Sequence, residues 1–130
     1  MMKEFISGLK GEACVTVSSE NTAKAVKSGC LDVFATPMLL ALLEEATCIC
    51  CAPMLDEGET TVGIKVCVSH DKASKIGEVI SAQAVLESAE GRKLIFTVSA
   101  KDSKGDIIGK GTIERFVVTE EKFMKRVQGV

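Results

Sequence analysis

The second half of the chain alternates apolar and polar residues with a period of two, which is typical of half-buried strands. Three rows expected to face the core follow from it: Val62, Ile64, Val66, Val68 and His70; Ile80, Ala82, Ala84 and Leu86; and Leu94, Phe96, Val98 and Ala100. A last strand is expected over 107–118, where Gly109 and Gly111 indicate a bulge or a close backbone approach. A short helix over 120–127 would end the chain.

The first half predicts one more strand and a long helix. Residues 12–19 alternate like a strand, whereas residues 21–29 have no clear period and are expected to form a loop. Thr36-Pro37 begins a helix that Pro53 ends, and its apolar residues point in nearly every direction, so it should be wrapped by other elements. The order predicts an α+β fold in which an antiparallel β-sheet wraps around a long central helix. Pairing of its open edges in a homodimer would cover them.

Length and composition narrow the range of partners. The 130 residues fit a single domain over 1–130, and the net charge of −2, without Trp, Tyr or a basic run, argues against nucleic acid. The first 15 residues lack an apolar run of secretory length, so a cytoplasmic location is expected. The apolar stretch 37–55 includes Glu44, Glu45 and Pro53, which favours a core helix over a membrane span.

Two titratable residues are expected to face the interior. Glu44 lies in the middle of the apolar helix, and His70 ends a strand on the core-facing row. An ionised carboxylate in an apolar wall costs several kcal/mol, on the order of 2–7, unless it is compensated. Thr36 and Gly63 complete the candidate set, although Thr36 and Glu44 would be about 12 Å apart along a helix. A long substrate or a second subunit would then be needed to join them.

These residue types suit acyl transfer. A buried Glu can activate water or attack an acyl carbon, with His70 sharing its proton and a backbone N–H near Gly63 facing a developing oxyanion. Structural alternatives remain open at this point: Thr36 as a helix cap, His70 as a structural histidine, Gly63 as a strand irregularity, and Glu45 rather than Glu44 as the buried acid.

The same positions carry a resemblance to a known family. The run Val33-Phe34-Ala35-Thr36, then Glu44, Val62-Gly63, Val68-Ser69-His70 and Gly111-Thr112-Ile113-Glu114-Arg115, resembles hotdog-fold thioesterases of the fluoroacetyl-CoA thioesterase type over roughly residues 10–127. The resemblance implies a dimeric hotdog fold, hydrolysis of a short acyl-CoA, catalysis by Thr36, Glu44 and His70, and a contact from the Gly63 backbone to the thioester. Val62, Phe34 and Arg115 are further expected substrate-binding residues. It implies no metal, and no cofactor beyond the coenzyme A of the substrate.

Two departures from this family bear on the substrate. Lys27-Ser28-Gly29-Cys30 stands where the fluoroacetyl-specific enzyme has aromatic lid residues, and Ile113 replaces a polar residue. The expectation is therefore an acyl-CoA thioesterase without selection for fluorine. A non-catalytic acyl-CoA-binding or regulatory hotdog protein is the alternative, and a hotdog dehydratase ranks third.

The cysteines and lysines add weaker hypotheses. Cys48, Cys51, Cys67 and His70 have a spacing compatible with zinc, but a helix and a regular strand would not converge them, so the cysteines are interpreted as small apolar fillers. Candidates to meet the phosphates of coenzyme A are Lys72, Lys75, Lys101, Lys104 and Arg115.

Overall fold

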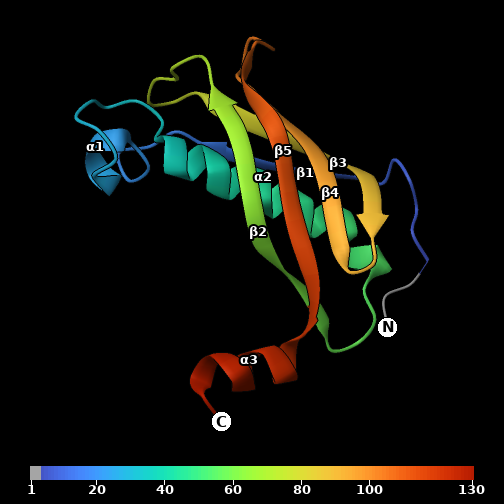
Figure 1. Ribbon diagram of the computed structural model, residues 1–130. Helices are drawn as coiled ribbons and strands as arrows, with labels where there is room; N and C mark the ends of the chain where they lie inside the picture. Colours follow the sequence, from blue (N-terminus) through green and yellow to red (C-terminus); the bar gives the residue numbers. More distant parts are fainter. Residues whose placement is uncertain (1–3) are drawn as a thin grey trace.

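A computed structural model describes residues 4–130. The elements are β1 (Lys10–Thr16), α1 (Ala23–Val26), α2 (Thr36–Cys51), a 3₁₀ turn (Ala52–Met54), β2 (Glu59–His70), β3 (Val79–Glu90), β4 (Lys93–Lys101), β5 (Ile107–Thr119) and α3 (Glu120–Gln128). The strands form one antiparallel sheet in the order β1-β3-β4-β5-β2, which curves around α2 (Figure 1). The predicted α+β fold is confirmed.

The core lies between the sheet and one face of α2. Every core-facing residue predicted on β3 and β4 is buried. α2 adds Leu39, Leu42, Leu43, Ala46, Thr47, Cys50 and Cys51. The opposite face of α2 is open in the single chain, where Ile49 is 47% exposed and Glu45 is exposed too. The expectation that the helix is wrapped on nearly every side is therefore wrong, because the sheet covers only one of its faces.

The long apolar helix also meets the length and hydropathy of a membrane span over Thr36–Met54. In the structure it places seven side chains of α2 beneath the sheet, as a core helix does. The predicted loop over 21–29 contains the short helix α1, capped by the Thr22 hydroxyl, which accepts a hydrogen bond from the Ala25 N–H at 3.1 Å.

β2 contains a bulge that determines which of its residues face α2. The register with β5 shifts between Gly63 and Lys65. Before the bulge, Gly63 lies against α2; after it, His70 does. Val62 pairs with Phe116 on the opposite face of the sheet. A single alternation running from Val62 to His70 is therefore wrong, since the bulge brings an odd and an even position to the same face.

The two edges of the sheet differ. At the β1 edge, Gly11 lies so close to α2 that a Cβ there would collide with the backbone of Ala46 and Cys50. At the β2 edge, Ile64 and Val66 are 51% and 37% exposed. An edge strand with exposed apolar residues invites pairing with another strand. The β2 edge is thus open in the single chain and carries exposed apolar side chains.

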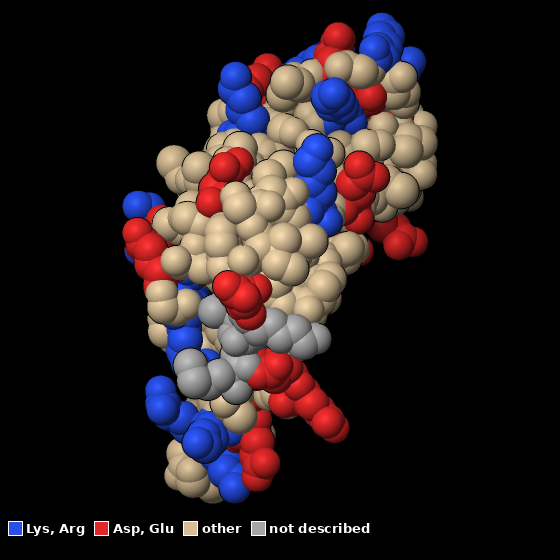
Figure 2. Space-filling model, turned by 90° about the vertical axis from the view of Figure 1, so that its right-hand side faces the viewer, with Lys and Arg blue, Asp and Glu red and all other residues tan. Residues whose placement is uncertain are grey.

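Charge is mixed over the surface that Figure 2 shows. Lys and Arg side chains stand among Asp and Glu side chains, with uncharged surface between them, on this face of the molecule. A nucleic-acid interface would instead gather basic residues on one surface. The mixture of positive and negative side chains on this face agrees with the small net charge of −2.

Candidate active site

Thr36 and His70 meet at the start of α2. The Thr36 Oγ1 lies 2.7 Å from the His70 Nδ1, so the two side chains share a hydrogen bond whose direction follows the imidazole tautomer. Thr36 is the first residue of the helix, while the N-cap position belongs to Ala35, which makes no side-chain cap. The alternative of Thr36 as a helix cap is therefore wrong, and its hydroxyl faces the imidazole instead.

The second ring nitrogen of His70 is left for another group. His70 Nε2 is buried and has no hydrogen-bond partner among residues 4–130. A hollow of about 250 Å³ opens beside it, and its lining includes Thr36, His70 and the buried Phe34. Burial lowers the pKa of His70 below its ordinary 6.5, while the Asp71 carboxylate acts in the opposite direction. The imidazole is thus favoured in its neutral form, which can accept a proton.

The acid of the candidate set lies in a second cluster. Arg115 Nη1 donates to Glu44 Oε2 at 3.0 Å, and the same guanidinium donates to the Thr61 hydroxyl at 2.9 Å and to the Thr61 carbonyl at 3.1 Å. The Arg115 side chain is only 8% exposed. A buried guanidinium needs such partners. It therefore fixes one carboxylate oxygen of Glu44, the Oε2.

Gly63 completes this cluster through its lack of a side chain. A Cβ built on Gly63 would lie 2.6 Å from Glu44 Oε2 and 3.3 Å from Arg115 Nη1. The β2 backbone therefore passes directly beside the carboxylate, as only glycine allows. Between the two neighbouring acids, Glu44 faces the sheet with 37% of its side chain exposed, whereas Glu45 is exposed on the opposite side. Of the two acids, Glu44 is therefore the one that lies against the sheet.

One chain holds these two clusters apart. Thr36 and Glu44 are eight residues apart on α2, a rise of about 12 Å. Gly63 and His70 are seven residues apart on β2, roughly 23 Å along a strand. Both clusters lie on the face of β2 that packs toward α2. The chain thus provides two half-sites, one with Thr36 and His70 and one with Glu44 and Gly63.

The other expected binding residues are divided. Phe34 lies with Thr36 and His70, and Arg115 lies with Glu44 rather than on the surface where a coenzyme A phosphate would be met. The Val62 side chain lies on the far face of the sheet, opposite Phe116, and so away from both half-sites of its own chain. Lys72 is occupied by two carboxylates, those of Asp102 and Asp106.

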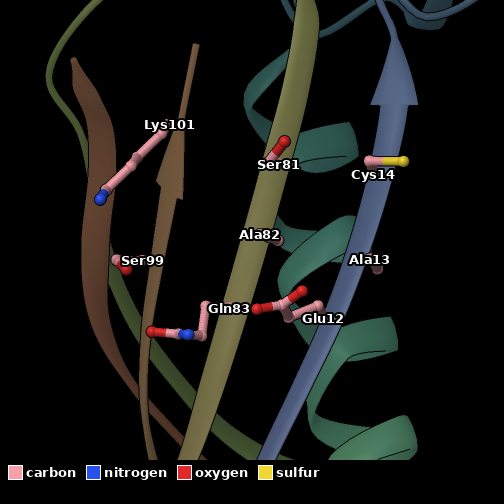
Figure 3. A pocket seen from close by; sticks show the side chains of 8 residues that line it. All are labelled: Glu12, Ala13, Cys14, Ser81, Ala82, Gln83, Ser99 and Lys101. Carbon is pink, nitrogen blue, oxygen red and sulfur yellow. The ribbon is translucent and has the colours of Figure 1, made fainter. Parts of the chain in front are cut away.

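A hollow on the outer face of the sheet and the cysteines lie outside these clusters. A hollow of about 380 Å³ lies on the outer face of β1, β3 and β4, and its side chains include Glu12, Gln83 and Lys101 (Figure 3). None of the Thr36, Glu44, Gly63 or His70 side chains lines it. Within residues 4–130, no three His, Cys, Asp or Glu side chains gather as metal ligands, so the cysteine spacing does not produce a zinc site there.

The neutral His70 gives a test of stability against pH. Because its pKa is lowered on folding, the unfolded chain binds the proton more tightly, and the free energy of unfolding should fall as pH drops below 6.5 toward the folded value. His70 is the only histidine of the chain, so one NMR ring signal reports its pKa directly. His70→Gln should reduce the pH slope of urea unfolding between pH 5 and 6.5; an identical slope would contradict the lowered pKa.

Comparison with known proteins places the chain in a family. A family model of fluoroacetyl-CoA-specific thioesterases matches residues 17–121. The fluoroacetyl-CoA thioesterase of Streptantibioticus cattleyicolor is 42% identical over 97 residues, covering 75% of this chain and 69% of that protein. A solved fluoroacetyl-CoA thioesterase superposes with a TM-score of 0.90 at 33% identity, covering 98% of both chains. A hypothetical Thermus thermophilus protein, a thioesterase superfamily member, reaches 0.89 at 26% identity over 98% of this chain and 96% of that one. The chain belongs to the fluoroacetyl-CoA-specific thioesterase family and has its hotdog fold.

Proposed function

We propose that this protein hydrolyses the thioester of a short-chain acyl-CoA at sites formed between two copies of the chain. Membership of a thioesterase family supports the reaction class. The observation that carries the shared site is the division of the candidate residues into two half-sites on the same face of β2. Each half-site holds only part of what acyl transfer requires, and a symmetric pair supplies the rest.

The open β2 edge supplies a geometry for such a pair. In our proposal, β2 pairs antiparallel with β2 of the partner subunit about a dyad at Cys67, so that residues opposite each other share a face of the sheet. This register sets Gly63 of the partner subunit opposite His70, because the bulge at Ile64 removes one residue from the count between Gly63 and the dyad. Glu44 of the partner subunit then approaches Thr36 and His70, and the pairing covers the exposed Ile64 and Val66. The homodimer forms two equivalent sites.

The chemistry follows from the groups that meet there. The carboxylate of Glu44 either removes a proton from the attacking water or attacks the thioester carbon itself, giving an anhydride that water then opens. The Gly63 N–H stabilises the negative charge on the acyl oxygen. Neutral His70, held by Thr36, accepts the proton that the attacking water loses and passes it to the departing coenzyme A thiolate. No cofactor beyond the coenzyme A of the substrate is required, and we propose a cytoplasmic location.

The acyl group is proposed to be short but not selected for fluorine. Residues 27–30, which follow α1, are exposed and carry no aromatic side chain, and Ser28 lines the hollow beside His70. A small side chain at this rim leaves the acyl site open to larger or more polar groups.

Thiol release measured across short, branched, aromatic and fluorinated acyl-CoAs tests this function. The proposal expects turnover of short acyl-CoAs with kcat/KM for acetyl-CoA and fluoroacetyl-CoA within about one order of magnitude, the discrimination expected for so small a change in an acyl group. Release at the background rate for every substrate would contradict hydrolysis. Tight binding of an acyl-CoA without release would instead identify the alternative, a non-catalytic acyl-CoA-binding protein.

Cys67 offers a direct test of the dimer. It is exposed on β2 and lies at the proposed dyad, so two copies of it should come within reach of a short bis-maleimide. In a variant with Cys14, Cys30 and Cys48 changed to Ser, the linker should give covalent dimers through Cys67. The same variant with Cys67→Ser is the control. Equal yields of cross-linked dimer from both proteins would contradict the proposed pairing of β2.

A further inference from the structure

The turn between β4 and β5 holds the residues that follow His70. Lys72 Nζ lies 2.6 Å from Asp102 Oδ2 and 2.7 Å from Asp106 Oδ2. The Asp102 side chain is only 2% exposed, and its other oxygen accepts hydrogen bonds from the N–H groups of Lys104 and Asp106, each at 3.0 Å. Asp102 is therefore a fixed anchor, because the turn satisfies one of its oxygens and Lys72 satisfies the other.

The backbone around His70 is tied to β5 at the same place. The N–H groups of Asp71 and Lys72 both donate to the Ile108 carbonyl, at 2.7 and 3.3 Å. Before His70, the Ser69 hydroxyl lies 2.7 Å from Asp71 Oδ2 and 3.2 Å from the Lys110 carbonyl. The residues on both sides of His70 are thus held, and the imidazole meets Thr36 from a backbone with little freedom to move.

Burying the Asp102 carboxylate is costly unless a cation pairs with it. The ion pair with Lys72 spans 30 residues of sequence and joins the turn to the segment that carries His70. Lys72 also lines the hollow that contains Thr36 and His70. A lysine there has two alternative uses: to meet a phosphate of coenzyme A, or to hold the segment. The two carboxylates already on its ammonium group favour the second.

We propose that Lys72, held by Asp102 and Asp106, is a positioning residue that sets the place of the His70 imidazole relative to Thr36. The ion-pair clamp of Lys72, Asp102 and Asp106 acts through His70 and does not touch the substrate. The kinetic part of this inference rests on the proposed thioesterase function, whereas the geometry of His70 does not.

NMR of the sole histidine tests the clamp without any activity. Thr36→Ala removes the hydrogen bond to Nδ1, so it should shift the His70 ring signals of the wild-type protein. In a Lys72→Met background the same change should have a much smaller effect, because the imidazole has already left Thr36. Lys75→Met, an exposed lysine of the same loop, is the matched control and should leave the full effect of Thr36→Ala in place. An equal effect in the Lys72→Met background would overturn the proposal.

Kinetics separate the two uses of Lys72. A misplaced catalytic group costs on the order of 10–100-fold in rate, so Lys72→Met should lower kcat by about that factor with KM little changed, and Lys72→Arg should restore most of it. A raised KM with unchanged kcat would overturn the proposal and identify a phosphate contact. If Lys72→Met does not fold, Asp106→Asn removes the exposed half of the clamp and should give a smaller change in the same direction. Unchanged His70 ring signals in Asp106→Asn would also overturn the proposed role of Lys72. Loss of activity in Glu44→Gln tests the proposed thioesterase function separately.

Discussion

Glu44→Gln is expected to lower kcat for acyl-CoA hydrolysis by about 10²–10⁴-fold, the range for losing a general base or nucleophile. The amide has the size of the carboxylate, and its oxygen can still accept the hydrogen bond from Arg115 Nη1. In the wild-type protein this nitrogen lies 3.0 Å from Glu44 Oε2. The fold and substrate binding should therefore change little. Thiol release at saturating substrate, with KM and the thermal unfolding midpoint measured beside it, checks this expectation.

Glu45→Gln is the matched control for this variant. It makes the same chemical change at the next position of α2, on the exposed face away from Arg115. Its kcat should remain close to that of the wild-type protein. A Glu44→Gln protein with wild-type kcat, or an equal loss in both variants, would contradict the role given to Glu44.

Gly63→Ala is expected to lower kcat by roughly 10²-fold, because about 1 Å of displacement of a catalytic group costs that much. The added Cβ would lie 2.6 Å from Glu44 Oε2, so the carboxylate or the strand must move. Arg115 Nη1, at 3.3 Å from that Cβ, restricts the movement on its side. Kinetics and urea unfolding of the variant measure the effects on rate and stability.

Cys67→Ala is the control for Gly63→Ala. It places alanine on the same strand, at an exposed position on the outer face. The control should keep its kcat, and Gly63→Ala should lose kcat while remaining folded under the assay conditions. Full activity of Gly63→Ala would show that the β2 backbone does not need to lie beside the carboxylate.

Much of the fold follows from the period of two. The buried rows on β3 and β4 are those predicted, because each strand is regular over the residues that the pattern used. β2 differs, since the bulge after Gly63 changes the phase of the strand. The alternative of Gly63 as a strand irregularity is therefore confirmed, although the period of two alone continues across it. The exposed face of α2 was also not predictable, because an apolar helix face reads the same whether the sheet or a second copy covers it.

The site shows the same division. The grouping of Thr36, Glu44, Gly63 and His70 came from apolar context and resemblance, whereas their separation into two half-sites requires coordinates. The pairing of Arg115 with Glu44 could have been predicted from the alternation of residues along β5. Arg115 shares its phase on β5 with the buried Ile113 and Val117, which predicts an inward guanidinium and hence a carboxylate partner.

The central claim is that Glu44 of one copy serves Thr36 and His70 of the other. Mixed dimers of Glu44→Gln and Thr36→Ala chains test it, because each variant alone should lose both sites. In the mixed dimer, one site combines an intact Thr36 with an intact Glu44, so purified heterodimers should recover about half of the wild-type kcat per dimer, as expected when one of two independent sites is restored. Heterodimers as inactive as either parent would show that each chain uses its own Glu44, and would contradict the shared site.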